Sequence, residues 1–253
     1  MPLTHPVLFH SEINGLFLKK IASSVSFDLS KGQSGYLDIG NDWWLNPTCE
    51  YSYQYFSLDP LYPSGYFLSP SHPSPTISAD LYAYMQDCFQ RLTGKHFASV
   101  LELGTGGGEI TREFRANHVD YIAVEGTKAG CERLLAQGIP RERIVECDLR
   151  KLKQIPRQFD LVMCTEVAEH IEPFFASKIA ENCVLHAPVV WFSCADRNRP
   201  AHVHHPNEQD LEVWDNLFAF LGCSVSVHLD NRYARAGRIY LKDDIVRIAP
   251  TGS

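Results

Sequence analysis

Apolar positions recur along the chain with two different periods, and the change of period predicts its elements. From Ser78 to Gly94 they return at helical spacing, which predicts an amphipathic helix that Ser78 caps and Gly94 ends. Beyond Gly94, short apolar runs alternate with helical patterns. Strands are predicted over 98–103, 121–126, 143–148, 159–164, 188–194, 224–229 and 238–243, and helices over 108–117, 127–137, 211–221 and from about Thr165. The alternation predicts an α/β fold around a parallel sheet, with ligands bound at the carboxyl ends of its strands.

The N-terminal part of the chain departs from this alternation. Residues 1–75 are rich in Pro, Ser, Gly and aromatic residues, and the frequent prolines exclude a regular helix there. We therefore expect an irregular, aromatic- and proline-rich arm or cap over 1–77 that packs on a domain over 78–253. Two roles are open for its aromatic side chains, which either close over a ligand or serve packing alone.

Composition and charge narrow the class of protein and of partner. The 253 residues are 45% hydrophobic and 21% charged, as in a soluble globular protein. A formal net charge of −7 disfavours bulk nucleic acid as a partner and favours a small molecule. The eight cysteines are scattered without a Cys-x-x-Cys pair, which favours reduced thiols. Because no secretory pattern or long apolar run occurs, we expect a cytoplasmic protein without a membrane anchor; the oligomeric state stays open.

A glycine-rich loop follows the first predicted strand, in the segment VLELGTGGGEI over 100–110. Glycines at such a position permit positive φ and let a ligand lie against the backbone. The dinucleotide-binding fingerprint requires a further glycine where this chain has Glu109. A carboxylate at that helix start repels a pyrophosphate, so the loop favours a cofactor without phosphate groups.

Acidic residues close the next two predicted strands. Glu125 ends the second strand, where a carboxylate can accept both hydrogen bonds of an adenosine ribose diol. Asp148 follows the third strand, at a height where it could accept a hydrogen bond from an adenine amino group. Leu149 beside it could cover the adenine ring. Together with the loop, these residues predict a nucleoside site along one edge of the sheet.

The order and spacing of these residues resemble the class I S-adenosylmethionine-dependent methyltransferases over about residues 97–195. The resemblance implies a Rossmann-like sheet and a methyltransferase activity. It also implies that Glu102 and the glycine loop hold the methionine part of S-adenosylmethionine, Glu125 the ribose and Asp148 the adenine. The expected cofactor contacts are Glu102, Gly104, Thr105, Gly106, Gly108, Glu125, Gly126, Asp148, Leu149 and Thr165. A nucleotide-free or dinucleotide-binding Rossmann domain remains the alternative.

A second group of polar residues follows the fourth predicted strand. The segment CTEVAEHIEP spaces two carboxylates and an imidazole three and four residues apart, so that they would share a helix face. Further along, HVHHPNEQ places His202, His204 and His205 in a loop that returns to the same edge. Carboxylates and imidazoles together suit a divalent metal: oxygen ligands favour Mg²⁺ or Mn²⁺, and the imidazoles widen the choice to Fe²⁺, Co²⁺ or Zn²⁺. The predicted metal ligands are Glu166, Glu169, His170 and His204, and the predicted catalytic residues are Glu166, His170 and His205.

Either chemistry at this second group serves methyl transfer. A metal ion would favour deprotonation of an acceptor hydroxyl and hold it for in-line attack. Without a metal, His170 or one of the later histidines would act as general base, because the ordinary histidine pKa of about 6.5 suits that role. The Glu-x-x-Glu-His spacing resembles the metal-dependent 2′-O-methyltransferases of small-RNA 3′ ends.

The segment HHPNEQDLEVW over 204–214 carries a different resemblance. It is similar to the His-x-Asn-Glu-Gln tract of methyltransferases that act on sugars and related metabolites. The leading hypothesis is therefore O-methylation of a small polar acceptor, namely a sugar, a nucleotide-sugar, or a phosphorylated or natural-product intermediate. RNA 2′-O-methylation and a non-catalytic cofactor-binding module are the alternatives.

Overall fold

In the computed structural model, the described part of the chain contains one mixed seven-stranded sheet and two two-stranded sheets. The residues that it describes are 2–4, 26–28, 37–38, 44–45, 62, 66–68, 75–152, 154–171, 173–195, 205, 207–228 and 237–242. Among the candidate residues, His202 and His204 lie outside the described residues, as does most of the aromatic-rich arm.

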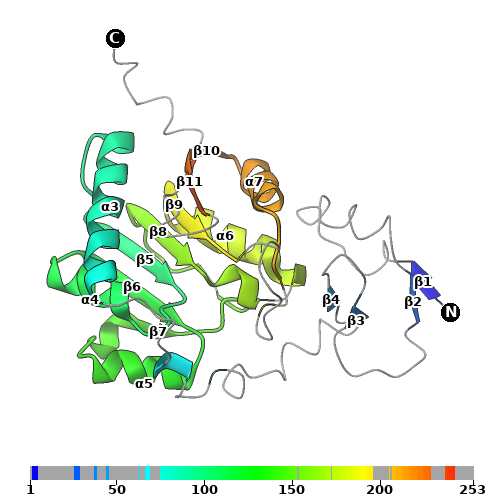
Figure 1. The fold of residues 1–253 in the computed structure, drawn as a ribbon, viewed down its shortest axis with the longest axis horizontal. Coiled ribbons are helices and arrows are strands. Elements are labelled where there is room, and N and C mark those ends of the chain that lie inside the picture. The colour runs from blue at the N-terminus through cyan, green and yellow to red at the C-terminus, as the bar shows by residue number, and fades with distance from the viewer. Residues whose placement is uncertain are drawn as a thin grey trace, which may run out of the picture.

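The central sheet has seven strands in the order β10-β11-β9-β8-β5-β6-β7 (Figure 1). Its parallel strands are β5 (Ser99–Leu103), β6 (Asp120–Glu125), β7 (Ile144–Glu146), β8 (Leu161–Thr165) and β9 (Val189–Ser193). The antiparallel strands are β11 (Gly237–Lys242), which pairs with β9, and β10 (Cys223–His228), which pairs with β11. The chain runs from β5 outward through β6 to β7 and then returns to β8 on the other side of β5. The switch point of the topology, where such sheets bind ligands, therefore lies between β5 and β8.

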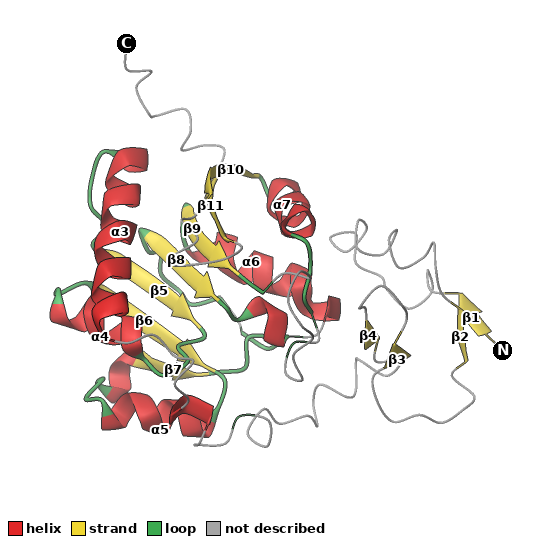
Figure 2. Cartoon of the chain, in the orientation of Figure 1, coloured by secondary structure: helices red, strands yellow, loops and turns green. Residues whose placement is uncertain are grey.

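Helices cover both faces of the sheet (Figure 2). They are α3 (Pro75–Thr93), α4 (Glu109–Ala116), α5 (Lys128–Ala136), α6 (Ala176–His186) and α7 (Leu211–Phe220), and a 3₁₀ turn, η5 (Arg141–Arg143), precedes β7. Side chains alternate between the two faces of each strand. Accordingly, Leu101 and Leu103 join a core with α6 and α7, whereas Val100 joins a core with α3, α4 and α5. The predicted α/β architecture is confirmed, and its strands read as apolar runs because both faces are buried.

Two predicted helix starts are wrong. The helix expected from Thr165 begins only at Ala176, after two 3₁₀ turns, η6 (Ala168–His170) and η7 (Pro173–Phe175). Glu166 takes a left-handed backbone with φ 51°, which a regular right-handed helix cannot include. The second error is a helix that begins earlier than predicted: α3 starts at Pro75 rather than at Ser78. Proline is tolerated in the first turn of a helix.

Short elements precede the sheet in the sequence. They are the two-stranded ribbons β1 (Pro2–Thr4) with β2 (Ser26–Asp28) and β3 (Leu37–Asp38) with β4 (Trp44–Leu45), and the 3₁₀ turn η4 (Tyr66–Leu68). Tyr62 and Phe67 are buried, so part of the expected arm packs against other residues. None of the helices in the described ranges has both the length and the apolar character needed to cross a bilayer.

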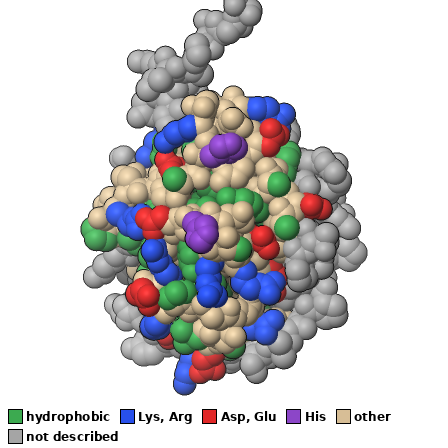
Figure 3. Space-filling model, turned by 90° about the vertical axis from the view of Figure 1, so that its left-hand side faces the viewer, with side chains coloured by type: hydrophobic (Ala, Val, Ile, Leu, Met, Phe, Trp, Pro, Cys, Tyr) green, Lys and Arg blue, Asp and Glu red, His purple; other side chains and the backbone are tan. Residues whose placement is uncertain are grey.

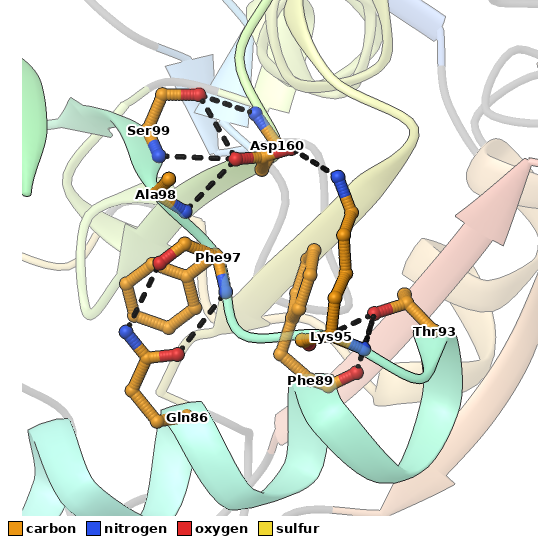
Figure 4. A network of polar contacts seen from close by, with 8 residues as sticks. All are labelled: Gln86, Phe89, Thr93, Lys95, Phe97, Ala98, Ser99 and Asp160. Carbon is orange, nitrogen blue, oxygen red and sulfur yellow. Dashed lines mark hydrogen bonds and ion pairs between the residues drawn. The ribbon is translucent and has the colours of Figure 1, made fainter.

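Asp160 joins the amino ends of β5 and β8, at the edge of the sheet opposite the glycine loop (Figure 4). Its Oδ2 accepts hydrogen bonds from the backbone N–H groups of Ala98 at 2.9 Å and Ser99 at 3.1 Å. Its Oδ1 accepts one from the Lys95 ammonium at 2.9 Å. The Asp160 N–H in turn donates to the Ser99 hydroxyl at 2.9 Å. One carboxylate thus fixes the register in which the two central strands begin.

We expect Asp160→Asn to lower the free energy of unfolding by about 1–3 kcal/mol, because a backbone N–H loses its charged acceptor. Burial works to raise the pKa of Asp160, but the hydrogen bonds from Lys95 and Ala98 outweigh it and hold that pKa below its ordinary value. This stability is therefore complete above the unfolded pKa of about 3.9 and is lost as the pH falls through the lower folded pKa. Urea unfolding at about pH 7 and pH 3 measures both effects.

The matched control for this prediction is Asp87→Asn. Asp87 pairs with Arg91 on the exposed side of α3, where the two side chains are 60% and 65% exposed. Such a surface pair contributes little. Equal destabilisation by the two substitutions would contradict the assigned role of Asp160.

Candidate functional site

The glycine loop turns directly out of β5 at the switch point of the sheet. Gly104, Gly106 and Gly108 have φ values of 77°, 52° and 80°, in the left-handed region that favours glycine. The Gly104 N–H donates to the carbonyl of Val124 at 2.9 Å, and the Gly108 N–H donates to that of Thr105 at 2.9 Å. The backbone is thus held in an open turn that presents main chain rather than side chains to a ligand.

Gly104→Ala is expected to destabilise the fold and to weaken binding in the loop. A Cβ at Gly104 would lie 2.5 Å from Cγ2 of Val167, so the segment after β8 must shift. Gly94→Ala is the matched control, because Gly94 has φ 78° but no atom within 4 Å of the added carbon. Gly94→Ala should lower the free energy of unfolding by about 1–2 kcal/mol, because alanine disfavours the left-handed backbone. Thermal melts of both variants check the difference, and equal losses would show that the contact with Val167 is unimportant.

Carboxyl groups gather around this loop. Glu102 on β5 is 3% exposed, and the Thr111 hydroxyl donates to its Oε2 at 2.6 Å. Burial raises the pKa of Glu102 to about 8 against the opposing hydrogen bond from Thr111. The negative charges of Glu109 and Glu125 raise that pKa further. A positively charged ligand group, such as an ammonium, would relieve this crowding of negative charge.

Glu102→Gln is expected to make the ligand-free chain more stable at alkaline pH. A carboxyl group with a folded pKa of about 8 against an ordinary 4.5 keeps a proton that the unfolded chain has released. The protonated Glu102 carboxyl group therefore contributes fully to the free energy of unfolding below about pH 4.5. This contribution is lost as the pH rises toward and through 8. Melting temperatures of both proteins from about pH 5 to 9 test this, because the variant should gain most at the alkaline end. Parallel curves would contradict the assignment.

Glu125 ends β6 with a carboxylate that three donors orient. The backbone N–H of Thr127 donates to its Oε1 at 2.9 Å, and the Thr127 hydroxyl does so at 2.8 Å. The Thr105 hydroxyl donates to Oε2 at 3.1 Å. A Cβ at Gly130 would lie 2.6 Å from Cδ of Glu125, so only glycine leaves room for this side chain. Burial raises the pKa of Glu125, although the hydrogen bonds from Thr127 and Thr105 oppose the rise.

Asp148 follows β7, and Arg150 sets its orientation. The Arg150 guanidinium donates to both carboxylate oxygens, at 3.0 Å from Nε to Oδ1 and 2.6 Å from Nη2 to Oδ2. The Arg150 side chain is 1% exposed and that of Asp148 14% exposed. Leu149, expected over the adenine ring, is buried in the core beside α6, and its carbonyl accepts a hydrogen bond from Asn182 at 2.9 Å. Asp148 therefore stays partly accessible after β7, whereas Leu149 packs in the core.

A cluster of Glu169, His170 and His205 lies beyond the carboxyl end of β8. Each side chain offers a ligand atom within 4.8 Å of the others. The rings of His170 and His205 meet edge to face, with centroids 4.6 Å apart and planes at 87°. Nδ1 of His205 lies 2.8 Å from Oε1 of Glu208. The structure thus brings together three of the residues that the sequence pointed to, and adds Glu208.

Glu166, also predicted here, is oriented differently. The Ser193 hydroxyl donates to its Oε1 at 2.9 Å, and the Glu166 N–H donates to the Ser193 carbonyl at 3.0 Å. The left-handed backbone at Glu166 means that it does not share a helix face with the two following polar residues. Glu166 therefore ties the end of β8 to the end of β9 and is not a member of the cluster.

Asn207 holds the later loop against η6. Its backbone N–H donates to the carbonyl of Glu169 at 3.2 Å, and its Nδ2 donates to that of Ala168 at 3.1 Å. Asn207 and Gln209 are fully buried. The Asn-Glu-Gln tract therefore has a structural role, because it brings His205 back to the edge where His170 lies.

Sequence reasoning missed several residues that orient the predicted ones. Thr127 and Arg150 each stand two positions after the carboxylate that they contact, and Glu208 stands three after His205. Such short spacings of donor and acceptor are visible in the sequence. Thr111 could not be found this way, because its bond to Glu102 depends on how α4 packs against β5.

Comparisons with known proteins agree with this geometry. A family model described as a methyltransferase domain matches residues 78–214, and no curated protein sequence matches the chain. A solved S-adenosylmethionine-dependent methyltransferase from Clostridium acetobutylicum is 13% identical, with a TM-score of 0.55 over 77% of this chain and 99% of that chain. The magnesium protoporphyrin IX methyltransferase from Synechocystis, solved with bound S-adenosylhomocysteine, is 12% identical, with a TM-score of 0.53 over 75% and 97%. The sugar N-methyltransferase KedS8 from a Streptoalloteichus species is 13% identical, with a TM-score of 0.54 over 67% and 88%.

Proposed function

Since the chain belongs to the methyltransferase-domain family and is a class I S-adenosylmethionine-dependent methyltransferase, we propose that it methylates an oxygen of a small polar metabolite. The observation that carries the proposal is the cluster of Glu169, His170 and His205, which closely follows Val167, the residue packed against Gly104 of the glycine loop. Sugars, nucleotide-sugars, and phosphorylated or natural-product intermediates are the acceptors that this combination of groups favours.

The residues around the glycine loop fit S-adenosylmethionine. At Gly104 and Gly108 an added Cβ would collide with Val167 and Leu134, so only glycine lets the turn lie this close to them. The neighbouring carboxyl groups favour the ammonium and sulfonium charges of the cofactor. Glu125 would hold the ribose hydroxyls, and Asp148, oriented by Arg150, the adenine amino group. When bound, the cofactor supplies an electrophilic methyl group on a sulfonium. The chain's own contribution is to position the acceptor and to hold or remove its proton.

Glu169, His170 and His205, together called the acceptor cluster, suit a divalent metal with nitrogen-rich ligation. Metal-bound histidines usually contact a carboxylate through their second ring nitrogen, and Nδ1 of His205 contacts Glu208 in this way. One carboxylate with two imidazoles favours Mn²⁺, Fe²⁺, Co²⁺ or Zn²⁺ more than Mg²⁺. Bound there, a metal would act as a Lewis acid on the acceptor oxygen. Without it, His170 or His205 would accept the acceptor proton.

Charge supports a small acceptor over RNA. The net charge is −7, and Lys and Arg side chains are interspersed with Asp and Glu on the face of the molecule in Figure 3. A strand of RNA is held by a continuous basic surface. The sequence also favours a small acceptor, because the segment over 204–214 resembles a tract of sugar-acting methyltransferases and contains His205.

Transfer of a labelled methyl group from S-adenosylmethionine to a panel of sugars, nucleotide-sugars and small RNAs tests the proposal. We expect product only with the small acceptors. Product only with RNA, and binding that weakens steeply with salt, would support 2′-O-methylation instead. If S-adenosylhomocysteine binds but no acceptor of the panel is methylated, the non-catalytic alternative gains support.

Metal binding has its own test, which needs no acceptor. Chelator-treated protein is titrated with Mn²⁺ or Zn²⁺ in a calorimeter. We expect one metal-binding site in the natural chain and none in Glu169→Gln. Glu166→Gln is the matched control, because the Glu166 carboxylate contacts Ser193 instead. Loss of the site in both variants would restore Glu166 as a ligand, and methyl transfer unchanged by thorough chelation would exclude the metal.

A further inference from the structure

Tyr62 comes from the N-terminal part of the chain, yet its side chain contacts the acceptor cluster. It precedes the family-matched residues 78–214 and is separated from His170 by 108 positions. Nevertheless the Tyr62 side chain is buried, and its hydroxyl lies 3.2 Å from Nδ1 of His170. This hydrogen bond attaches a residue outside the common domain to the proposed reaction centre.

Two tyrosine rings and a histidine ring pack on the His170 imidazole. The Tyr62 ring meets it edge to face, with centroids 5.7 Å apart and planes at 81°. The Tyr66 ring of η4 does the same at 6.4 Å and 89°, and it packs on Tyr62 at 5.0 Å. His205 contacts the imidazole as well, at 4.6 Å. These contacts restrict rotation of the ring, so the partner of Nδ1 is fixed in place.

The partner at Nδ1 determines what Nε2 can do. A neutral imidazole carries its proton on one nitrogen and a lone pair on the other. If the Nδ1–H group donates to the Tyr62 oxygen, the lone pair is on Nε2. Only a nitrogen with a lone pair can bind a metal or accept a proton from a hydroxyl. Whether Nδ1 donates to the Tyr62 oxygen or accepts from it therefore decides whether Nε2 carries a lone pair or a proton.

We propose that Tyr62 is a positioning residue for methyl transfer, whose hydroxyl holds His170 as the Nδ1–H tautomer so that Nε2 presents its lone pair to the acceptor side. This inference rests on the proposed function, because it gives His170 a role in handling the acceptor. Glu208 holds His205 through the same ring nitrogen, at 2.8 Å. Both imidazoles of the cluster are thus oriented through Nδ1. Glu208 orients His205, and Tyr62 of the N-terminal segment orients His170.

The test uses Tyr62→Phe in the full chain, which keeps the ring contacts and removes only the hydroxyl. The ¹⁵N spectrum of labelled, chelator-treated protein distinguishes protonated from bare ring nitrogens, and His170→Gln identifies the His170 signals. At about pH 8, where an imidazole with the ordinary pKa of about 6.5 is mostly neutral, we expect the Nδ1–H form in the natural chain. In Tyr62→Phe that form should lose its dominance. Tyr82→Phe is the matched control, because its hydroxyl contacts Gln86 on α3.

The outcomes separate this inference from the function on which it rests. An Nε2–H form of His170 in the natural chain, or an unchanged spectrum in Tyr62→Phe, would overturn the role of Tyr62. The first of these measurements needs no variant to fold. Calorimetry with S-adenosylhomocysteine is run on the same samples, and absence of binding in the natural chain would instead count against the proposed function. Binding of similar strength in Tyr62→Phe, together with the altered spectrum, is the result expected.

Discussion

Replacing Glu125 with glutamine is expected to weaken the binding of S-adenosylhomocysteine by about 100-fold. The Thr127 N–H and hydroxyl both donate to Oε1, so the amide oxygen of the variant would stay there and its NH₂ group would replace Oε2. An NH₂ group cannot accept a hydrogen bond from a ribose hydroxyl. Losing one charge-assisted hydrogen bond, worth about 1.5–3 kcal/mol, and the negative charge accounts for a change of this size.

Calorimetry on the two proteins measures this effect, and the neighbouring strand provides the control. Glu146 ends β7 in register with Glu125, but its side chain is 48% exposed and pairs with Arg141 at 3.5 Å. Glu146→Gln should therefore bind the ligand as the natural chain does. An affinity of Glu125→Gln within about threefold of the natural value would remove Glu125 from the ribose site, since one lost hydrogen bond already exceeds that factor.

The second large effect is expected at His170. His170→Gln should slow methyl transfer to the acceptor found in the panel by about 10²–10⁴-fold, because the group that handles the acceptor proton is lost. Binding of S-adenosylhomocysteine should hardly change, since Glu102 on β5, Glu125 at the end of β6 and Asp148 after β7 belong to other segments of the chain. A selective loss of rate would therefore locate His170 on the acceptor side.

Initial rates at saturating cofactor, with acceptor concentration varied, provide the measurement. His96→Gln is a suitable control. His96 is exposed in the loop before β5, and its ring hydrogen-bonds to Gln86, far from the cluster in sequence. Full activity of His170→Gln would contradict a role in proton handling. Equal loss of cofactor binding would show that His170 acts through the fold instead.

The cofactor side of the fold was predictable because its signals are local. An apolar strand followed directly by glycines specifies a tight turn, and the φ values of Gly104 and Gly108 show the left-handed backbone that this spacing requires. Glu125 and Asp148 could be placed because residues that end parallel strands meet at one edge. Each of these inferences needed only the spacing between a strand and the residue after it.

The acceptor side was less predictable because it depends on backbone geometry and on distant contacts. Helical periodicity in the segment after β8 does not reveal the left-handed turn at Glu166, which redirects that carboxylate to Ser193. The pairing of Tyr62 with His170 joins residues 108 positions apart. No periodic pattern specifies such a contact, because Tyr62 and His170 come together only in the folded chain.

The position of Tyr62 has a consequence for how such an enzyme can diversify. Groups that fit the cofactor occupy one stretch of chain, from Glu102 to Asp148, whereas the acceptor cluster draws on segments before and after it. On the proposed assignment of the two sites, substitutions in the flanking segments would alter substrate preference while the donor-binding stretch is inherited unchanged. Exchange of the leading segment between related genes would transplant part of one enzyme's selectivity into another.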